Sequence, residues 1–310
     1  MRMRHVPCAT PLAIDFFIKT TMTLQRSDFR FFHRLRVRWA EVDMQHIVFN
    51  AHYLMYLDTA MGDYWRTLAL PYQESMVLLG GDMYVKKAAL EYHASARYDD
   101  TLHIGLRCAR VGNSSLVFEG GIFRGDTLLV SGELLYVFAD PASQTSRPVP
   151  DALRQVFAQY EARQTVTQTT VGRWSDWGAR VTPLRRAVFV EEQAISETLV
   201  WDEADAVAVH AVVHNALGQV VACGRMLTHA PGVARIGRMA THQMLRGGGL
   251  GLQVLRALIK TARERGDHEV MLHAQCSAEE FYLREGFVRR GEVFVEVGIA
   301  HQEMALVLAA

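Results

Sequence analysis

The chain has 310 residues, of which 50% are apolar and 21% are charged. This length predicts two domains, because single domains usually span about 100–200 residues. The apolar content and the formal net charge of zero exclude a mainly disordered chain. Lys plus Arg equal Asp plus Glu, 33 against 33, so charge gives no argument for nucleic acid as a partner, and we expect none.

Apolar runs and cysteine spacing exclude further classes of protein. No apolar run approaches the roughly 18–20 residues that a membrane-spanning helix needs, so we expect no membrane span. The four cysteines lie far apart and form no CxxC pair, which argues against a zinc ribbon or a disulfide scaffold. We interpret them as buried, reduced thiols of a cytoplasmic protein. The histidines show no HxH or HExxH spacing, so no metal is predicted.

The N-terminal segment needs separate treatment. Residues 1–21 begin with basic residues and contain a short apolar patch, as secretory signals do. Pro11, Asp15 and Lys19 interrupt the patch, so no signal-like apolar segment remains. We therefore interpret residues 1–27 as a disordered extension.

The first half of the chain predicts a sheet with one long helix. Polar and apolar residues alternate over 33–40, as in a half-buried strand, and apolar spacings of three and four over 51–70 predict an amphipathic helix. Four more strands are expected at 84–92, 101–111, 114–124 and 127–139, followed by a short helix at 151–162. This order predicts an antiparallel sheet with a helix packed on it, an α+β architecture. The polar, Gln- and Thr-rich residues that follow predict a linker.

The second half has a different pattern. Helices are expected at 182–193 and 278–285, and strands at 205–214, 219–227, 234–241, 269–275, 292–297 and 303–308. A glycine-rich loop at 246–251 opens a further periodic helix, which ends near Gly266. A strand, a helix and a second strand form a βαβ unit, which requires local parallel pairing.

Acidic residues lie between the first strand and the long helix. A helix N-terminus presents unpaired N–H groups that can polarise a carbonyl oxygen. A carboxylate opposite them, such as Asp43, can attack an acyl group or activate water. The chemistry suits hydrolysis of an activated acyl group. On the pattern alone, such residues are more often helix caps or solvated loop residues, and both interpretations stay open.

The segment from Arg36 to about Tyr160 resembles hotdog-fold acyl-CoA thioesterases of the YbgC, FadM and 4-hydroxybenzoyl-CoA thioesterase type. The matching features are Asp43, Ile47-Val48, Asn50-Ala51, Tyr53, Tyr98-Asp99-Asp100 and Val137-Phe138 before Asp140-Pro141. The resemblance implies a long helix wrapped by a curved antiparallel sheet. It also implies that two protomers pair to build the active sites, so a homodimer or tetramer is expected.

The same resemblance assigns roles in the site. The catalytic carboxylate falls on Asp43, and the backbone N–H that polarises the thioester carbonyl falls on Asn50. Many relatives carry Gly where this chain has Gln45 or His46, and many carry His in place of Asn50. We interpret Glu41 as a solvated neighbour of the site and His46 as structural.

The glycine-rich loop consists of Arg246, Gly247, Gly248, Gly249, Leu250 and Gly251. Glycines let the backbone approach a ligand closely, and the following helix N-terminus presents N–H groups to an anion. The pattern indicates a phosphate or pyrophosphate cradle, with a loop that binds nothing as the alternative. It is neither a P-loop, because no Gly-Lys-Ser/Thr follows, nor a GxGxxG fingerprint.

Residues 175–308 resemble the GNAT N-acetyltransferases. Arg246, Gly249 and Gly251 form the RxxGxG pattern, and residues 278–287 resemble the last helix of that superfamily. Features of the ElaA-type subfamily lie at 189–193, Asp202, Asp205, His210, 273–275 and 298–301.

This resemblance also assigns roles. The loop 246–251 binds the CoA pyrophosphate, and Tyr282 assists the leaving thiolate. The backbone that pairs with the pantetheine amides belongs to Arg238, Met239, Ala240 and Thr241. Four side chains are candidates to take the proton of the amine, and none is preferred: Glu192, His273, Glu296 and His301.

Together these observations predict an α+β protein with a disordered extension at 1–27, a hotdog domain at 28–161, a linker at 162–171 and a GNAT domain with a mixed sheet at 172–310. The predicted function is acyl-CoA hydrolysis fused to acetyl transfer from acetyl-CoA to an unidentified amine. The CoA thioesters are substrates, and no tightly bound cofactor is expected. In one alternative only one half is catalytic and the other binds CoA or dimerises. In another the chain binds acyl-CoA without turnover.

Overall fold

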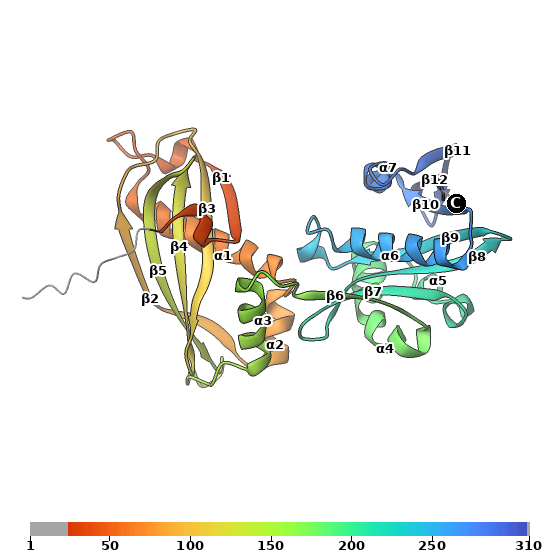
Figure 1. Ribbon diagram of the computed structural model, residues 1–310, viewed down its shortest axis with the longest axis horizontal. Helices are drawn as coiled ribbons and strands as arrows, with labels where there is room; N and C mark the ends of the chain where they lie inside the picture. The colour runs from red at the N-terminus through yellow and green to blue at the C-terminus, as the bar shows by residue number, and fades with distance from the viewer. Residues whose placement is uncertain (1–23, 309–310) are drawn as a thin grey trace, which may run out of the picture.

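The computed structural model describes residues 24–308 and shows two units, each built on its own β-sheet (Figure 1). The extension expected at 1–27 lies outside the described residues except for residues 24–27, and a 3-10 turn begins there at Arg26–Asp28. None of the helices within 24–308 combines the length and the apolar character needed to cross a membrane.

The first unit is an antiparallel sheet of five strands in the order β1-β3-β4-β5-β2. The strands are β1 (Phe31–Arg36), β2 (Asp82–Tyr92), β3 (Thr101–Val111), β4 (Ser115–Arg124) and β5 (Thr127–Ala139). Figure 1 shows this sheet curving around the helix α1 (Asn50–Thr67). The predicted antiparallel sheet with one long helix is therefore confirmed.

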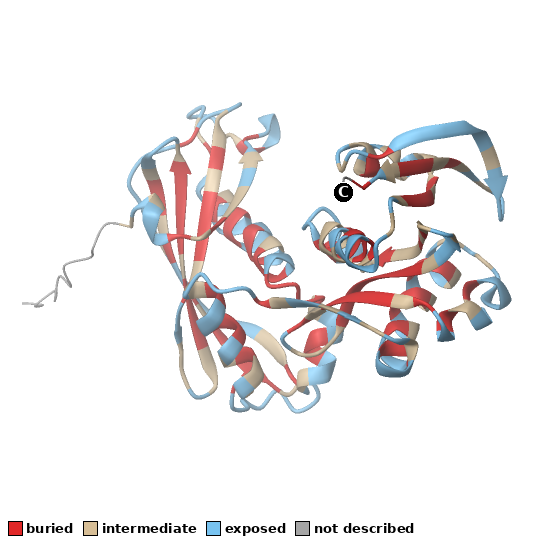
Figure 2. Cartoon of the chain, turned by 45° about the vertical axis from the view of Figure 1, so that its right-hand side comes forward, coloured by how far each residue is buried: buried red, intermediate tan, exposed pale blue. Residues whose placement is uncertain are grey.

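Burial and small residues bring α1 close to the sheet. Leu57, Ala60 and Tyr64 of α1 are fully buried, as the helical spacing of apolar residues predicts. Figure 2 shows that buried and exposed segments alternate along the helices of the chain. A Cβ atom added at Gly120 of β4 or Gly132 of β5 would lie 2.5 and 2.9 Å from the Leu57 side chain. These two glycines are therefore needed for the close contact between the helix and the sheet.

Two further helices complete the first unit. The helix α3 (Asp151–Glu161) lies where the sequence predicts it. The helix α2 (Tyr72–Leu79) was not predicted, because eight residues are too few to show a periodic pattern. It follows Pro71 and ends at Gly80. The φ of Gly80 is 69°, which is the left-handed conformation in which helices commonly end.

The second unit is a mixed sheet of seven strands in the order β11-β12-β10-β9-β8-β7-β6. The strands are β6 (Thr167–Gly172), β7 (Val209–Asn215), β8 (Val220–Ala230), β9 (Val233–Thr241), β10 (Glu269–Gln275), β11 (Val288–Glu296) and β12 (Ile299–Val307). The strands β9 and β10 pair in parallel, and the other neighbours are antiparallel. The parallel pair confirms the predicted βαβ unit.

Helices cover both faces of this sheet (Figure 1). The helix α6 (Leu250–Arg265) packs on one face and α4 (Trp174–Arg185) on the other. Two short helices, α5 (Glu197–Val200) and α7 (Glu279–Leu283), flank the ends of the strands. The α+β architecture with a mixed second sheet is thus as predicted.

Several predicted elements differ from the structure in their bounds. The strand expected at 33–40 ends at Arg36, before a 3-10 turn at Trp39–Glu41, and the strand expected at 205–214 begins at Val209, after a 3-10 turn at Glu203–Ala206. The expected linker at 162–171 is shorter, because its last residues belong to β6, an edge strand paired only with β7. An edge strand leaves one side exposed, so its polar Thr and Gln residues resemble a linker in the sequence. The helix expected at 182–193 begins at Trp174 and passes into a π-helical turn at Arg186–Glu192.

Direct contacts join the two units. The side-chain amide of Asn215 in β7 donates to the carbonyl oxygen of Ala69, just after α1, over 2.9 Å. The hydroxyl of Ser75 in α2 donates to the side-chain carbonyl of Gln219 over 3.0 Å. Asn215 and Ser75 are buried, so these hydrogen bonds fix the second sheet against the end of α1 and α2.

Candidate functional site

Asp43 lies in a tight turn just before α1. Its amide donates to the carbonyl of Ile47 and its carbonyl accepts from the amide of His46, each over 2.9 Å. One carboxylate oxygen accepts from the amide of Gln45 over 2.8 Å. The other accepts no hydrogen bond from residues 24–308, so it is open to a ligand.

His46 explains one departure from the thioesterase pattern. Its φ is 59°, in the left-handed region that glycine adopts without strain. The glycine that many relatives carry at this point fits the same turn. The structure therefore supports a structural role for His46.

The N-terminus of α1 is uncapped. Phe49 occupies the cap position and offers no side-chain hydrogen bond, so neither Asp43 nor Asn50 caps the helix. Within the described residues nothing accepts a hydrogen bond from the N–H of Asn50, and this residue is exposed. The first turn of α1 therefore presents N–H groups and a positive dipole end to a ligand.

The interpretation of Glu41 as a solvated neighbour is wrong. Its side chain is buried and accepts hydrogen bonds from the guanidinium of Arg38 over 2.6 and 2.8 Å and from the hydroxyl of Tyr56 over 2.8 Å. Burial alone raises the pKa of Glu41, but the hydrogen bonds from Arg38 and Tyr56 outweigh it and lower the pKa overall. Glu41 ties the turn to α1.

In the second unit, a cavity of about 440 Å³ opens where β9 and β10 diverge. Their parallel pairing ends at Ile236 and Leu272, and residues after those points line the cavity from both strands. Two of the four residues predicted to pair with pantetheine, Arg238 and Met239, line it. Diverging strands leave backbone groups free to pair with an extended ligand.

The remaining part of β9 has one occupied edge and one open edge. Ala240 and Thr241 pair with β8, and within residues 24–308 no strand pairs with their other edge. The side chain of Arg238 does not contribute to this open edge. It donates to the carbonyl oxygens of Leu199 and Val200 over 2.8 and 3.1 Å.

The predicted loop follows β9 and leads into α6. Gly247 and Gly249 have φ of 82° and 80°, which explains why glycine stands there. Gly249 also occupies the N-cap of α6 and leaves the N–H groups of the first turn without a side-chain cap. The guanidinium of Arg246 donates to both carboxylate oxygens of Glu192.

Tyr282 lies in α7 and lines the same cavity. Its side chain is buried, and this burial raises the pKa of the phenol to about 12. The phenol therefore stays protonated at neutral pH, as a proton donor must.

Family comparisons agree with both halves of this description. Residues 45–131 match the thioesterase superfamily, and residues 179–308 match the acetyltransferase (GNAT) domain. The chain is a fusion of a thioesterase domain with a GNAT acetyltransferase domain. The hotdog and GNAT assignments made from the sequence are confirmed.

Three similar proteins each match less than half of this chain. The UPF0039 protein C11D3.02c of Schizosaccharomyces pombe is 32% identical over 127 residues, which cover 40% of this chain and 84% of that protein, and the chain belongs to its family. The acyl-CoA thioester hydrolase YbgC of Escherichia coli is 29% identical over 126 residues, 40% of this chain and 93% of that protein. A crystal structure of a putative N-acetyltransferase from Lactobacillus plantarum is 28% identical, with a TM-score of 0.44, over 47% of this chain and all of that one.

Three of the four predicted proton acceptors line the cavity of the GNAT domain: His273, Glu296 and His301. The fourth, Glu192, is engaged by Arg246, whose hydrogen bond lowers the pKa of this carboxyl. His301 differs from the others because its Nδ1 lies 2.8 Å from the carbonyl oxygen of Ile299. A carbonyl only accepts, so Nδ1 carries the proton and Nε2 of the neutral ring keeps a lone pair.

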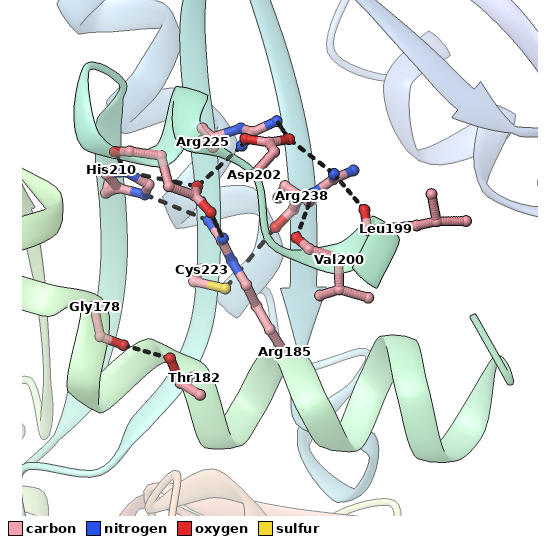
Figure 3. A network of polar contacts seen from close by, with 11 residues as sticks. Gly178, Thr182, Arg185, Leu199, Val200, Asp202, His210, Cys223, Arg225 and Arg238 are labelled. Carbon is pink, nitrogen blue, oxygen red and sulfur yellow. Dashed lines mark hydrogen bonds and ion pairs between the residues drawn. The ribbon is translucent and has the colours of Figure 1, made fainter. Parts of the chain in front are cut away.

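A buried ionic network lies beside the cavity and includes Arg185 and Arg225, which the sequence analysis did not single out. Figure 3 shows Arg185 of α4 pointing from below toward Arg225 and His210. Arg185 donates to both carboxylate oxygens of Asp205, over 2.9 and 3.0 Å, and Arg225 donates to Asp205 over 3.0 Å and to Asp202. The network fixes Asp202 at the cavity wall.

Proposed function

We propose that the thioesterase domain hydrolyses acyl-CoA thioesters and that the GNAT domain transfers an acetyl group from acetyl-CoA to an amine. The observation that supports hydrolysis is an isolated antiparallel β-bridge between Val42 and Val48. This bridge closes the turn, so the open carboxylate oxygen of Asp43 lies at the same end of α1 as the free N–H of Asn50.

The proposed hydrolysis uses these two groups together. The N–H of Asn50 donates to the thioester oxygen, and such a donor stabilises the transition state by about 2.7–4 kcal/mol. Asp43 either activates a water molecule or attacks the carbonyl carbon itself. The carbon–sulfur bond breaks and CoA leaves. In the first route the product is the free acid, and in the second route water then hydrolyses the acyl anhydride on Asp43 to the free acid.

The proposed transfer uses the cavity of the GNAT domain. The open edge of β9 pairs with pantetheine, and the first turn of α6 together with the loop 246–251 binds the diphosphate. Nε2 of His301 takes a proton from the acceptor ammonium, and the amine nitrogen then attacks the acetyl carbonyl. The carbon–sulfur bond breaks, and the leaving CoA thiolate accepts the proton of Tyr282. The acetylated nitrogen then gives its surplus proton to the Tyr282 phenolate, which yields the neutral amide.

We also propose that the thioesterase domains pair as a homodimer or tetramer. The strand β2 is an edge strand of eleven residues, most of them exposed, and an unpaired edge of this length is a template for another strand. Exposed apolar side chains flank the Asp43 turn, among them Met44 at 96% and Phe49 at 50% exposure. A second copy would cover them.

The deciding experiment measures thiol release from short, long and aryl acyl-CoAs without any amine. Asp43→Asn should lower release by about 10²-fold or more. Asp126→Asn is the matched control, because Asp126 is almost fully exposed in the β4–β5 turn. Hydrolysis by Asp43→Asn at the wild-type rate would contradict the site. If the wild-type chain releases no thiol, yet acetylates amines, the thioesterase domain serves in binding or assembly.

A further inference from the structure

Three charged or titratable side chains meet at one point of the GNAT cavity. Nδ1 of His273 lies 3.1 Å from the guanidinium of Arg235 and also 3.1 Å from the carboxylate of Glu296. All three residues line the cavity. A cation and an anion are therefore held next to each other around one ring nitrogen.

One nitrogen cannot satisfy both neighbours. When Nδ1 of the neutral ring carries a proton, it donates to Glu296 and cannot accept from Arg235. When Nδ1 carries a lone pair, it accepts from Arg235 and leaves Glu296 without a donor. In either tautomer one charge of the cluster lacks its partner, so it remains available to a ligand of opposite charge.

Arg235 differs from the other arginines of this cavity. Arg225 and Arg238 both bind the carboxylate of Asp202. Among residues 24–308, Arg235 has no carboxylate within 4.0 Å, and the one hydrogen bond of its side chain joins it to His273. A half-buried guanidinium with free donors is a suitable partner for a carboxylate or phosphate group.

The cluster lies beside the groups that would carry out the transfer. The ring of Phe294 packs edge-to-face on His273 at 4.8 Å and stacks on His301 at 6.0 Å, measured between ring centroids. Tyr282 and His301 line the same cavity as Arg235 and Glu296. An acceptor anchored at the cluster therefore places its amine among the reacting groups.

We propose that the acceptor of the GNAT domain is a small primary amine that also carries an anionic group, a carboxylate or a phosphate. Arg235 binds the anionic group, and Glu296 attracts the ammonium before His301 deprotonates it. The cavity, at about 440 Å³, fits a small molecule. This inference rests on the proposed acetyl transfer and adds the class of its acceptor.

The test compares matched acceptors in a thiol-release assay with acetyl-CoA and the full chain. Phenylalanine is measured beside phenylalaninamide and phenethylamine, and phosphoethanolamine beside ethanolamine, at equal concentrations of free amine. We expect at least a tenfold higher kcat/KM for the anionic members of one or both sets. The two sets distinguish a carboxylate from a phosphate.

Variants of Arg235 test the assigned residue. Arg235→Gln should lower kcat/KM for the anionic acceptors at least tenfold more than for the neutral amines, so that the preference is lost, and Arg235→Lys should restore part of it. Arg256→Gln is the matched control, since Arg256 lies on α6 and pairs with Glu285 outside the cavity. An unchanged preference in Arg235→Gln would overturn the assignment of Arg235.

If none of the acceptors is acetylated, a measurement of binding by thermal unfolding decides the result. The CoA-loaded protein is heated with each compound, and the anionic amines should raise the unfolding temperature of the wild type but not of Arg235→Gln. Acetyl-CoA binding without any such preference overturns the acceptor proposal alone. Failure to bind acetyl-CoA overturns the proposed transfer together with it.

Discussion

The carboxylate of Glu192 holds the guanidinium of Arg246 through two hydrogen bonds of 2.6 Å each. Arg246 opens the loop that leads into α6, and Glu192 ends the π-helical turn next to Gln193, which lines the cavity. The predicted pyrophosphate loop therefore already holds an anion. A CoA diphosphate that binds to Arg246 must compete with Glu192.

Removing this competition should change the affinity for CoA. In Glu192→Gln the guanidinium of Arg246 is free to bind the diphosphate, so we expect acetyl-CoA to bind a few-fold more tightly. This size follows from the value of partly exposed ion pairs, about 0.2–1 kcal/mol. Titration calorimetry measures it. Glu279→Gln, which breaks the pair with Arg289 elsewhere, is the control. Weaker binding in Glu192→Gln would instead mean that Glu192 orients Arg246 for the ligand.

Local patterns predicted most of the fold. The bounds of β3, β5 and β10 agree with the sequence because alternation and turn residues delimit them. Elements with weak local patterns were missed or misread. The helix α2 has only eight residues, and β6 is polar because it lies at the edge of its sheet.

Contacts between distant residues were harder to predict in the sites. The sequence predicted that Asp43 precedes the long helix, that the glycine loop opens a helix and that Tyr282 lies in a helix, but it did not predict their surroundings. Nothing local shows that Glu41 accepts a hydrogen bond from Tyr56, fifteen residues further on. The pairing of Arg185 with Asp205, twenty residues apart, likewise arises only when α4 packs on the sheet.

Tyr282 allows a test of the leaving-group step. Tyr282→Phe should lower kcat for acetyl transfer by about 10²-fold, because proton donation to the thiolate is lost, and leave KM for acetyl-CoA near the wild-type value. Initial rates with a fixed amine measure both constants. Tyr98→Phe, an exposed tyrosine of the thioesterase domain, is the control. Since the pKa of Tyr282 is about 12, an alkaline decline near pH 10 that disappears in Tyr282→Phe would contradict this account.

The proposed assembly through β2 is tested by a charge at the edge strand. Val85 is 57% exposed and neighbours two lysines, Lys86 and Lys87. Val85→Lys should therefore convert the homodimer or tetramer to smaller species, since a buried charge without a partner costs several kcal/mol. Light scattering coupled to size exclusion measures the mass. Val207→Lys, at a highly exposed position of the GNAT domain, should leave it unchanged. A wild-type monomer would contradict the assembly itself.

His210 is held neutral inside the ionic network. Its Nε2 lies 2.9 Å from the backbone carbonyl of Asp205, so Nε2 carries the proton, and its Nδ1 faces the guanidinium of Arg185 at 3.4 Å. Protonation of Nδ1 would direct an N–H at that cation. Burial and the charge of Arg185 lower the pKa of His210 below 6.5, against the opposing effect of Asp205.

This lowered pKa predicts how stability depends on pH. As pH falls below about 6.5, the unfolded chain binds a proton at His210 that the native state excludes, so the free energy of unfolding decreases down to the native pKa. The slope is at most about 1.4 kcal/mol per pH unit for one such group. His210→Gln should reduce this slope between pH 7.5 and 5.5, measured by urea unfolding. His103→Gln is the comparison, because burial also lowers the pKa of His103, in the other domain. An unchanged slope in His210→Gln would mean that His210 is already protonated in the folded chain.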